Sequence, residues 1–455
     1  MINIKIKDIV EAVDGVLLCG DENQEIKHIS IDSRQSKGND LFVPIIGEKV
    51  DAHNFISQAF DSGCIATLTS KHKEMNHTHS FIYVKDTIKA LHDIGRLCRS
   101  RTTVPVVGVT GSVGKTTTRE MIATALSAEK SIYKTGKNYN SQIGVPITLS
   151  EMPNDVDMAV LELGMNVPGE LGLISKMTIL DAAVVTNVGV AHIEFFGTKE
   201  KICEEKLTIT SGLKENGLLF LNGDDELLYQ YKDSTSFTPI LYGTSPRCTY
   251  RGENIAMKNG KYTFEFVFDT IRIPVTLSVL GVHNVVNAVG ALAVAHKFGV
   301  DLTKAAKALE GFTGFMNRLE VHKVNGYTII DDTYNASPDS MKAGIDVLCG
   351  MEEKGKKIAV LGDMFELGEQ SSNYHYQVGK AISEKPFDFA ILVGKQASYI
   401  GKAMEDTQSN IPIMYEMSNE EVSKYLKRTL TAGDVVYLKA SNGMKLKEIT
   451  ASLLS

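Results

Sequence analysis

The sequence predicts an α/β protein of three domains, with a mostly parallel nucleotide-binding sheet at its centre. Its 455 residues are enough for two to four domains. Short apolar runs typical of buried parallel strands alternate with stretches of helical periodicity. One such run, residues 104–109, is followed directly by a glycine-rich loop and a helix. We therefore expect a P-loop-type central sheet with flanking helices, a smaller α/β domain before it and a Rossmann-like sheet after it.

The expected domains are residues 1–100, 101–314 and 315–455. A basic helix at 91–101 leads from the first domain to the central sheet. The runs predicted to be strands are 104–109, 158–163, 182–187 and 218–221 in the central domain, and 327–330, 357–361, 389–393 and 435–438 in the last. From residue 262, alternating aromatic residues after Asn259 and Gly260 predict a half-buried antiparallel hairpin.

Composition and charge exclude several classes of protein. A net charge of −7 gives no general basic field, so we expect no nucleic-acid partner. The six cysteines lie far apart and form no CxxC pair, which favours reduced thiols over a disulfide or zinc framework. No apolar run is long enough for a bilayer and no signal sequence is evident, so we expect a cytoplasmic protein without membrane insertion.

The glycine-rich loop after the strand at 104–109 is suited to a nucleotide phosphate. Its backbone N–H groups and the following helix N-terminus can surround one anion. Lys115 would add a charge on the outer phosphates, and the Thr116 hydroxyl a ligand for Mg²⁺. The common pattern has glycine where this chain has Val109. The residues expected to hold the phosphates are Thr110, Gly111, Ser112, Val113, Gly114, Lys115 and Thr116.

The loop sequence Gly-Val-Thr-Gly-Ser-Val-Gly-Lys-Thr-Thr-Thr, residues 108–118, resembles the ATP loop of the Mur ligase family. These are ATP-dependent, amide-forming enzymes of peptidoglycan precursor synthesis. The resemblance implies an ADP-forming ligase that uses ATP and Mg²⁺.

Three further residues of the central domain are candidates for catalysis and metal binding. Glu162 ends an apolar strand, where open α/β sheets bind ligands, and Mg²⁺ would offset its burial; a structural ion pair is the alternative. His192 also follows a strand, and the family's Asn-x-x-x-Ala-His segment implies that it is a ligand rather than a structural histidine. By composition Lys206 is a solvated helix lysine, whereas the resemblance implies the family lysine that CO₂ converts to a carbamate.

Four residues downstream match family positions that hold the nucleoside. Asn284 and Asn287 correspond to adenine-facing asparagines, and Arg318 to the arginine of a Gly-Arg-x-Glu segment whose glycine is Asn317 here. Asp332 belongs to a segment that follows a strand and opens a helix. The resemblance implies that these four side chains grip ATP across a domain cleft.

The candidate substrate residues fall in three segments. The loop at 135–146 could be a surface turn, but it resembles the segment that approaches the acceptor carboxylate, with Ser141 replacing a usual asparagine. Residues 29–55 could be turns on a solvated edge, but they resemble a uridine-nucleotide-binding domain. The implied substrate residues are Ser33, Arg34, Gly47, Asp51 and His53 for the UDP-sugar, Asn138 and Asn140 for the acceptor carboxylate, and Asn335 and Ser340 in the last domain.

The segments at 331–341 and 361–368 distinguish best between members of the family that add different groups. They resemble the members that add D-alanyl-D-alanine. This implies that UDP-N-acetylmuramoyl-tripeptide and D-alanyl-D-alanine are joined through an acyl phosphate by a monomeric enzyme.

Two alternatives remain open. One is another ligase of this family, or an enzyme similar to folylpolyglutamate synthase, that adds a single amino acid or glutamate to a different acceptor. The other is a P-loop ATPase that acts as a switch or binding module, which would leave the sugar-nucleotide segment unexplained.

Overall fold

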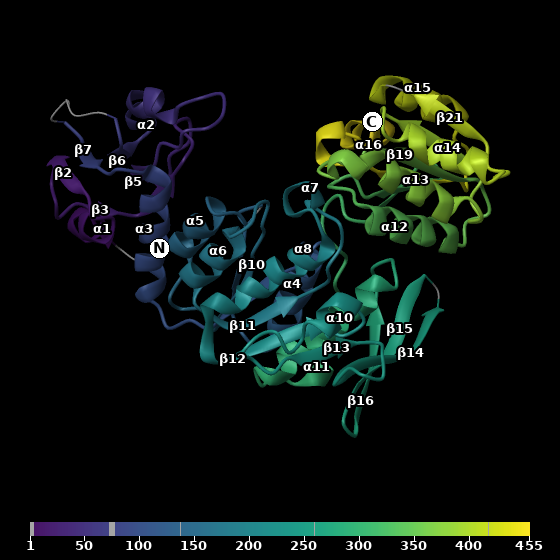
Figure 1. The fold of residues 1–455 in the computed structure, drawn as a ribbon, viewed down its shortest axis with the longest axis horizontal. Helices are drawn as coiled ribbons and strands as arrows, with labels where there is room; N and C mark the ends of the chain where they lie inside the picture. Colours follow the sequence, from purple (N-terminus) through teal and green to yellow (C-terminus); the bar gives the residue numbers. More distant parts are fainter. Residues whose placement is uncertain (1–3, 72–77, 137, 259, 417) are drawn as a thin grey trace.

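The computed structural model describes residues 4–71, 78–136, 138–258, 260–416 and 418–455, and it has the predicted three-domain α/β fold (Figure 1). Each of its three large sheets takes its strands from one of the three predicted units. The first and third domains lie on opposite sides of the central domain in this view.

The first domain contains a five-stranded sheet in the order β2-β7-β6-β5-β4. Its strands are β2 (Val16–Cys19), β4 (His28–Ser30), β5 (Asp40–Phe42), β6 (Cys64–Thr69) and β7 (Ser80–Tyr83), and β1 (Ile4–Lys5) pairs with β3 (Glu25–Ile26). The helices are α1 (Ile6–Ala12), η1 (Ala52–Phe55), α2 (Ile56–Asp61) and α3 (Thr87–Ser100). The predicted basic helix is α3, and it begins earlier than expected because the Asp86 side chain accepts hydrogen bonds from the N–H groups of Ile88 and Lys89.

The central domain has a nine-stranded sheet in the order β16-β15-β14-β13-β12-β11-β8-β10-β9. The strands are β8 (Val106–Thr110), β9 (Ile132–Lys134), β10 (Met158–Glu162), β11 (Leu180–Val185), β12 (Leu213–Asn222), β13 (Ile240–Gly243), β14 (Tyr250–Lys258), β15 (Lys261–Phe268) and β16 (Ile271–Leu277). Pairing is parallel from β9 to β14 and antiparallel from β14 to β16. The predicted hairpin is therefore confirmed as β14 and β15, with Phe264 and Phe266 buried, whereas Asn259 of its turn lies outside the described residues.

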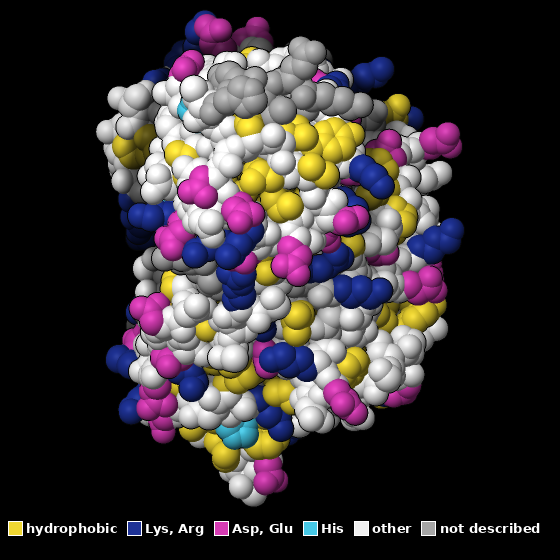
Figure 2. All heavy atoms as spheres, turned by 90° about the vertical axis from the view of Figure 1, so that its left-hand side faces the viewer, with side chains coloured by type: hydrophobic (Ala, Val, Ile, Leu, Met, Phe, Trp, Pro, Cys, Tyr) yellow, Lys and Arg dark blue, Asp and Glu magenta, His cyan; other side chains and the backbone are white. Residues whose placement is uncertain are grey.

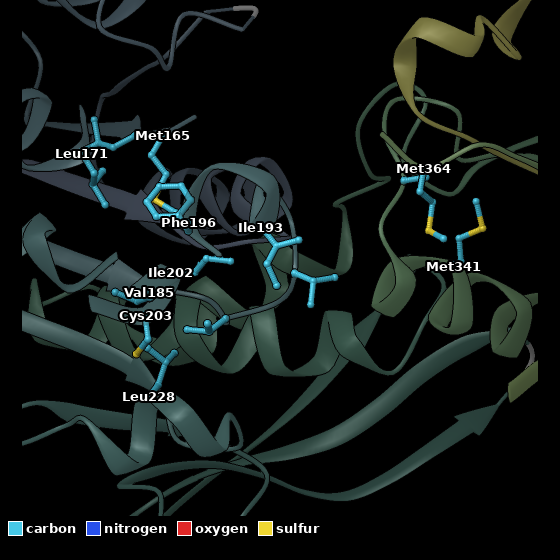
Figure 3. Packing of buried hydrophobic residues seen from close by; sticks show 14 of the residues in the cluster. Met165, Leu171, Val185, Ile193, Phe196, Ile202, Cys203, Leu228, Met341 and Met364 are labelled. Atoms are coloured by element: carbon cyan, nitrogen blue, oxygen red, sulfur yellow. The ribbon is translucent and has the colours of Figure 1, made fainter. Parts of the chain in front are cut away.

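Helices cover both faces of this sheet. They are α4 (Lys115–Leu126), α5 (Gly144–Glu151), α6 (Glu170–Thr178), α7 (Ile193–Phe196), α8 (Lys199–Leu207), η2 (Thr208–Gly212), α9 (Glu226–Gln230), α10 (His283–Lys297) and α11 (Leu302–Glu310). Val107 of β8 belongs to the apolar cluster with α4 and α10, and Val106 to the cluster with α6 and α8. Figure 3 shows part of the second cluster, which includes Met165 and Phe196 of α7. This packing fixes β8 between β10 and β11, directly before the phosphate loop.

Helix α5 begins inside the segment expected to be a polar loop. The backbone becomes helical at Gly144, and Pro146 lies in the first turn. Proline is tolerated there because the first helical N–H groups have no partner within the helix. The Gly-Val-Pro sequence therefore starts a helix rather than ending a turn.

The third domain has a six-stranded sheet in the order β17-β18-β22-β19-β20-β21, antiparallel only between β17 and β18. Its strands are β17 (Glu320–Val324), β18 (Tyr327–Asp331), β19 (Lys357–Gly362), β20 (Phe389–Val393), β21 (Ile413–Glu416) and β22 (Val435–Lys439). The helices are α12 (Pro338–Gly350), η3 (Gly368–Gln370), α13 (Ser371–Ile382), α14 (Ser398–Asp406), α15 (Asn419–Thr429), η4 (Asn442–Met444) and α16 (Lys447–Leu454). The predicted Rossmann-like sheet is confirmed.

The surface of the first domain carries charges of both signs. In Figure 2, which shows the left-hand side of Figure 1, lysine and arginine side chains are interspersed with aspartate and glutamate. Within the described parts of the chain, no helix combines the length and apolarity that a bilayer span requires.

Candidate active site

A cavity of about 1040 Å³ lies between the central and third domains. The central domain contributes the phosphate loop, the segments after β10 and β11, and the start of α10. The third domain contributes the segment after β18, the first turns of α12, and the end of β22. The carboxyl ends of several parallel strands therefore face one space, where open α/β sheets bind ligands.

Two glycines and Asn187 set the backbone path of the phosphate loop. Gly111 and Gly114 have φ angles of +150° and +79°, and a Cβ atom at Gly111 would lie 1.8 Å from Thr186 Oγ1. Asn187 holds the loop from outside, because its carbonyl accepts the Ser112 N–H at 3.0 Å and its side-chain oxygen accepts the Val113 N–H at 3.0 Å. Glycine is therefore favoured at both positions by the backbone conformation, and at Gly111 also by the close approach of Thr186.

Lys115 is held at the mouth of the loop and lines the cavity. Its ammonium group donates to the carbonyls of Gly111 at 2.8 Å and Ser112 at 3.3 Å. Burial lowers the pKa of Lys115; Glu162 opposes this shift and Arg318 adds to it. The loop carbonyls therefore hold a cation where the outer phosphates of a nucleotide would lie.

Glu162 lies beside Thr116, as its strand-end position predicted. The carboxylate is 4% exposed and accepts hydrogen bonds from Thr116 Oγ1 and Asn140 Nδ2, both at 2.8 Å. A hydroxyl and a carboxylate in contact offer hard oxygen donors that suit Mg²⁺. Among the described residues, no three His, Cys, Asp or Glu side chains form a metal cluster. Thr116 and Glu162 therefore fit an ion whose remaining ligands are supplied by the nucleotide and by water.

Arg119 is a buried residue near this carboxylate that sequence reasoning missed. Its Nη1 atom donates to the Thr135 carbonyl at 2.9 Å and lies 3.7 Å from Glu162 Oε2, and Nη2 pairs with Glu120. Thr135 in turn accepts the backbone N–H of Glu162 at 2.9 Å. The structural ion pair considered as the alternative for Glu162 is therefore present, alongside the Thr116 contact.

His192 contacts the third domain. Its backbone is left-handed, with φ of +65°, and its Nδ1 atom lies 2.5 Å from Glu366 Oε2. This contact holds the pKa of Glu366 below its usual value. Glu366 belongs to the 361–368 segment, and nothing in that segment's local pattern shows that it reaches another domain.

Lys206 is not the solvated helix lysine that composition alone suggested. The side chain is 1% exposed, and among the described residues its amine has no hydrogen-bond partner other than Met165 Sδ at 3.9 Å. A thioether is a weak acceptor. Burial lowers the pKa of Lys206 well below its usual value, and the nearby Lys115 adds to the shift. Met165 lines the cavity whereas Lys206 lies behind it.

The four candidate nucleoside residues all line the cavity. Asn287 Nδ2 donates to Asn284 Oδ1 at 2.9 Å, and the Arg318 guanidinium lies 4.0 Å from the centre of the Tyr334 ring. Asp332 accepts from Lys439 Nζ at 2.5 Å. Lys439 is a buried lysine at the end of β22 that sequence reasoning also missed, although its strand-end position was a usable signal.

The candidate acceptor residues are only partly brought together. Asn140, Asn335 and Ser340 line the cavity, but Asn138 is exposed and lies outside its lining. Ser340 also has a structural contact, because its hydroxyl accepts the N–H of Ser337 at 2.9 Å at the start of α12.

The five UDP-sugar candidates lie in the first domain, outside this cavity. Arg34 is exposed and makes a two-point contact with Asp32 at 2.9 and 2.8 Å, which lowers the pKa of Asp32 to about 2. Asp51 pairs with Lys71 and with His53 Nδ1. The His53 ring is buried and its Nε2 accepts the Ser70 N–H at 3.1 Å, so His53 also holds this turn.

Comparison with known proteins decides the family. Three family models match consecutive parts of the chain: the catalytic domain of the Mur ligase family over residues 25–97, the Mur ligase middle domain over 109–295, and the Mur ligase glutamate ligase domain over 317–442. A UDP-N-acetylmuramoyl-tripeptide–D-alanyl-D-alanine ligase from Bacillus subtilis is 37% identical, with 100% of this chain and 99% of the relative covered. The chain belongs to the Mur ligase family.

Other relatives of this Mur ligase show the same full-length similarity. The enzyme of that name from Haemophilus influenzae is 32% identical, with 100% of this chain and 99% of the relative covered. A crystal structure of MurF from Acinetobacter baumannii matches with a TM-score of 0.91 and 28% identity over 99% of both chains. MurF from Thermotoga maritima, solved in complex with ADP, matches with a TM-score of 0.83 and 28% identity over 94% of this chain and 97% of that one.

Proposed function

We propose that this Mur ligase joins D-alanyl-D-alanine to UDP-N-acetylmuramoyl-tripeptide and converts ATP to ADP and phosphate. The carrying observation is the cavity itself, in which a phosphate loop, the Thr116–Glu162 pair and the third-domain residues Arg318 and Asp332 face one space. The enzyme is cytoplasmic and monomeric in this proposal, and its domains are residues 1–100, 101–314 and 315–455.

The chemistry follows from the poor reactivity of a carboxylate toward an amine. A carboxylate oxygen of the tripeptide attacks the γ-phosphorus of ATP, the bond to ADP breaks, and an acyl phosphate forms. The dipeptide amine attacks the acyl carbon and loses a proton, and phosphate leaves with both electrons of the C–O bond. Lys115 holds the γ-phosphoryl group, and the cavity positions the reactants.

The bound Mg²⁺ ions would neutralise phosphate charge. Thr116 and Glu162 are the proposed ligands of one ion, and His192 with carbamylated Lys206 those of a second. The Lys206 amine supports this role, because no oxygen atom of the described residues stabilises its charged form. The neutral amine forms a bond to the carbon of CO₂ and loses one proton, which leaves an anion with two oxygen donors suited to a hard cation.

The remaining candidates bind substrates in this proposal. Ser33, Arg34, Gly47 and Asp51 contact the UDP-sugar, and His53 supports them through Asp51. The tripeptide carboxylate lies near Asn140, with Asn138 beside it, while Asn335 and Ser340 contribute from the third domain. Asn284, Asn287, Arg318 and Asp332 hold the nucleoside.

The test is ADP release across a panel of UDP-muramoyl peptides, with and without D-alanyl-D-alanine. We expect release only when a tripeptide acceptor and the dipeptide are both present. Release with a single amino acid, or with a shorter acceptor, would instead support another activity within the family.

A further inference from the structure

An aspartate at the start of α12 faces the cavity without a partner. The segment at 331–341 contains three aspartates, two of which have partners: Asp331 accepts hydrogen bonds within its own turn, and Asp332 pairs with Lys439. The third, Asp339, is the second residue of α12; its side chain is exposed and lines the cavity. Among the described residues, none donates a hydrogen bond to its carboxylate or forms an ion pair with it. The third domain therefore presents an unpaired negative charge to the cavity.

Asp339 lies next to the phosphate loop, across the boundary between the two domains. A Cβ atom at Gly189 would lie 3.0 Å from Asp339 Oδ2 and 3.3 Å from the Cβ atom of Ser112. Gly189 is itself held to the loop, because its N–H donates to Ser112 Oγ at 2.8 Å. The absence of a side chain at Gly189 thus lets a third-domain carboxylate approach the place where the outer phosphates of ATP are proposed to lie.

A carboxylate in this place needs a positive charge from a ligand. ATP and the acyl phosphate are anions, and they would be repelled by Asp339. The proposed Mg²⁺ ligands all belong to the central domain. The remaining group that must reach the acyl carbon is the dipeptide nitrogen, which gains positive charge as its new bond forms. A fixed carboxylate beside this nitrogen would stabilise the charge where it develops.

We propose that Asp339 is a catalytic residue that accepts a hydrogen bond from the attacking amine of the dipeptide. This inference rests on the proposed function. The neutral amine donates one N–H to the carboxylate, and its lone pair attacks the acyl carbon. As the C–N bond forms, the nitrogen becomes cationic and Asp339 offsets its charge. The nitrogen then gives one proton to the carboxylate, from which it passes to solvent, and phosphate leaves with both electrons of the C–O bond.

The neighbours of Asp339 agree with this role. Asn335 and Ser340, the residues proposed to bind substrate from the third domain, belong to the same segment and line the same cavity. All three are presented by the start of α12 and the turn before it. The carboxylate therefore belongs to the part of the third domain that is proposed to hold the dipeptide.

The test measures the two half-reactions separately in the full-length enzyme. Steady-state ADP release at varied D-alanyl-D-alanine gives kcat/KM for the amine. Hydroxylamine in place of the dipeptide converts the acyl phosphate to a hydroxamate, which reports how fast the acyl phosphate forms. We expect Asp339→Asn to lose roughly tenfold or more in kcat/KM for the dipeptide, the scale of a hydrogen bond to a charged group, and to form hydroxamate within about twofold of the wild type.

Three variants complete the test. Asp346→Asn, the same substitution at an exposed position of α12, is the matched control and should leave both rates unchanged. Asp339→Glu keeps the charge and should recover part of the loss. Asp339→Ala removes the same carboxylate, and it takes the place of Asp339→Asn if a thermal melt shows that the asparagine variant folds poorly.

Any of three results would overturn the proposal. The first is a neutral Asp339 variant with the wild-type kcat/KM for the dipeptide. The second is an equal loss of hydroxamate formation, and the third a loss of Mn²⁺ affinity in the presence of ADP, since these would assign Asp339 to the phosphate or metal site. If the wild type ligates a single amino acid instead of the dipeptide, the proposed function alone is rejected, and the same comparison with that amine decides the role of Asp339.

Discussion

Two lysines beside the cavity, Lys115 and Lys206, have opposite environments. Lys115 lines the cavity and donates to two backbone carbonyls. Lys206 lies behind Met165, with a sulfur atom at 3.9 Å. Burial lowers the pKa of both, but well below the usual value only at Lys206. Backbone carbonyls stabilise the Lys115 amine as a cation, whereas the surroundings of Lys206 favour a neutral, nucleophilic amine. The two lysines cannot be told apart by residue type alone.

The largest expected effect is that of Lys115→Ala. Lys115 is the cation held at the phosphate loop, so its removal should reduce ligation by at least ~100-fold, as loss of a preorganised charge in an active site does. Steady-state ADP release measures this, and circular dichroism with a thermal melt checks the fold. A folded Lys115→Ala variant that keeps a tenth of wild-type turnover would show that Lys115 is not the essential cation at the phosphate loop.

Lys206→Ala should also lose nearly all activity, because it removes the proposed carbamate. A small carboxylate such as acetate should restore part of it. Wild-type activity should fall when CO₂ is stripped at mildly acidic pH, since acid converts the amine to ammonium and favours loss of CO₂. The control is Lys201→Ala, an exposed lysine of the same helix. If Lys206→Ala stays within a few-fold of wild type, the carbamate is rejected.

Arg318→Ala should distinguish ligand binding in the cavity from ligand binding in the first domain. The guanidinium lines the cavity and stacks on Tyr334, so its loss should weaken ATP binding by roughly tenfold or more, the scale of a hydrogen bond to a charged group. UDP-sugar binding should stay unchanged. Calorimetry with each ligand alone measures both, and equal losses would count against a nucleotide site between the last two domains.

Arg34→Ala should have the smallest effect on ligand binding. In contrast to Arg318→Ala, it should weaken UDP-sugar binding and leave ATP binding unchanged. The side chain is 75% exposed and its pair with Asp32 is a surface contact, so we expect little change in stability. Affinity for the UDP-sugar should fall by about tenfold, because a forked guanidinium suits a diphosphate, while ATP binding should not change. Arg34→Lys keeps the charge without the fork. An Arg34→Ala variant with wild-type UDP-sugar affinity would exclude Arg34 from the site.

Much of the fold was predictable because strand periodicity and glycine position are local signals. The strand at 389–393 was placed to the residue, and the phosphate loop followed from its own pattern. Glu162 beside Thr116 followed from a strand-end rule. The contacts of Arg119 and Glu366 were not predictable, because each joins segments far apart in the chain, whereas the strand-end position of Lys439 was a signal that was missed. The burial of His53 and Lys206 depends on tertiary packing in the same way.

The most direct test of carboxylate activation is the fate of isotopic oxygen. The tripeptide is labelled with ¹⁸O in the carboxylate that becomes the amide, and the phosphate released in the presence of ATP and D-alanyl-D-alanine is analysed by mass spectrometry. An acyl phosphate requires that one carboxylate oxygen leaves with phosphate, so each phosphate formed during ligation should carry one ¹⁸O atom. Phosphate without ¹⁸O, formed together with the amide product, would contradict the account.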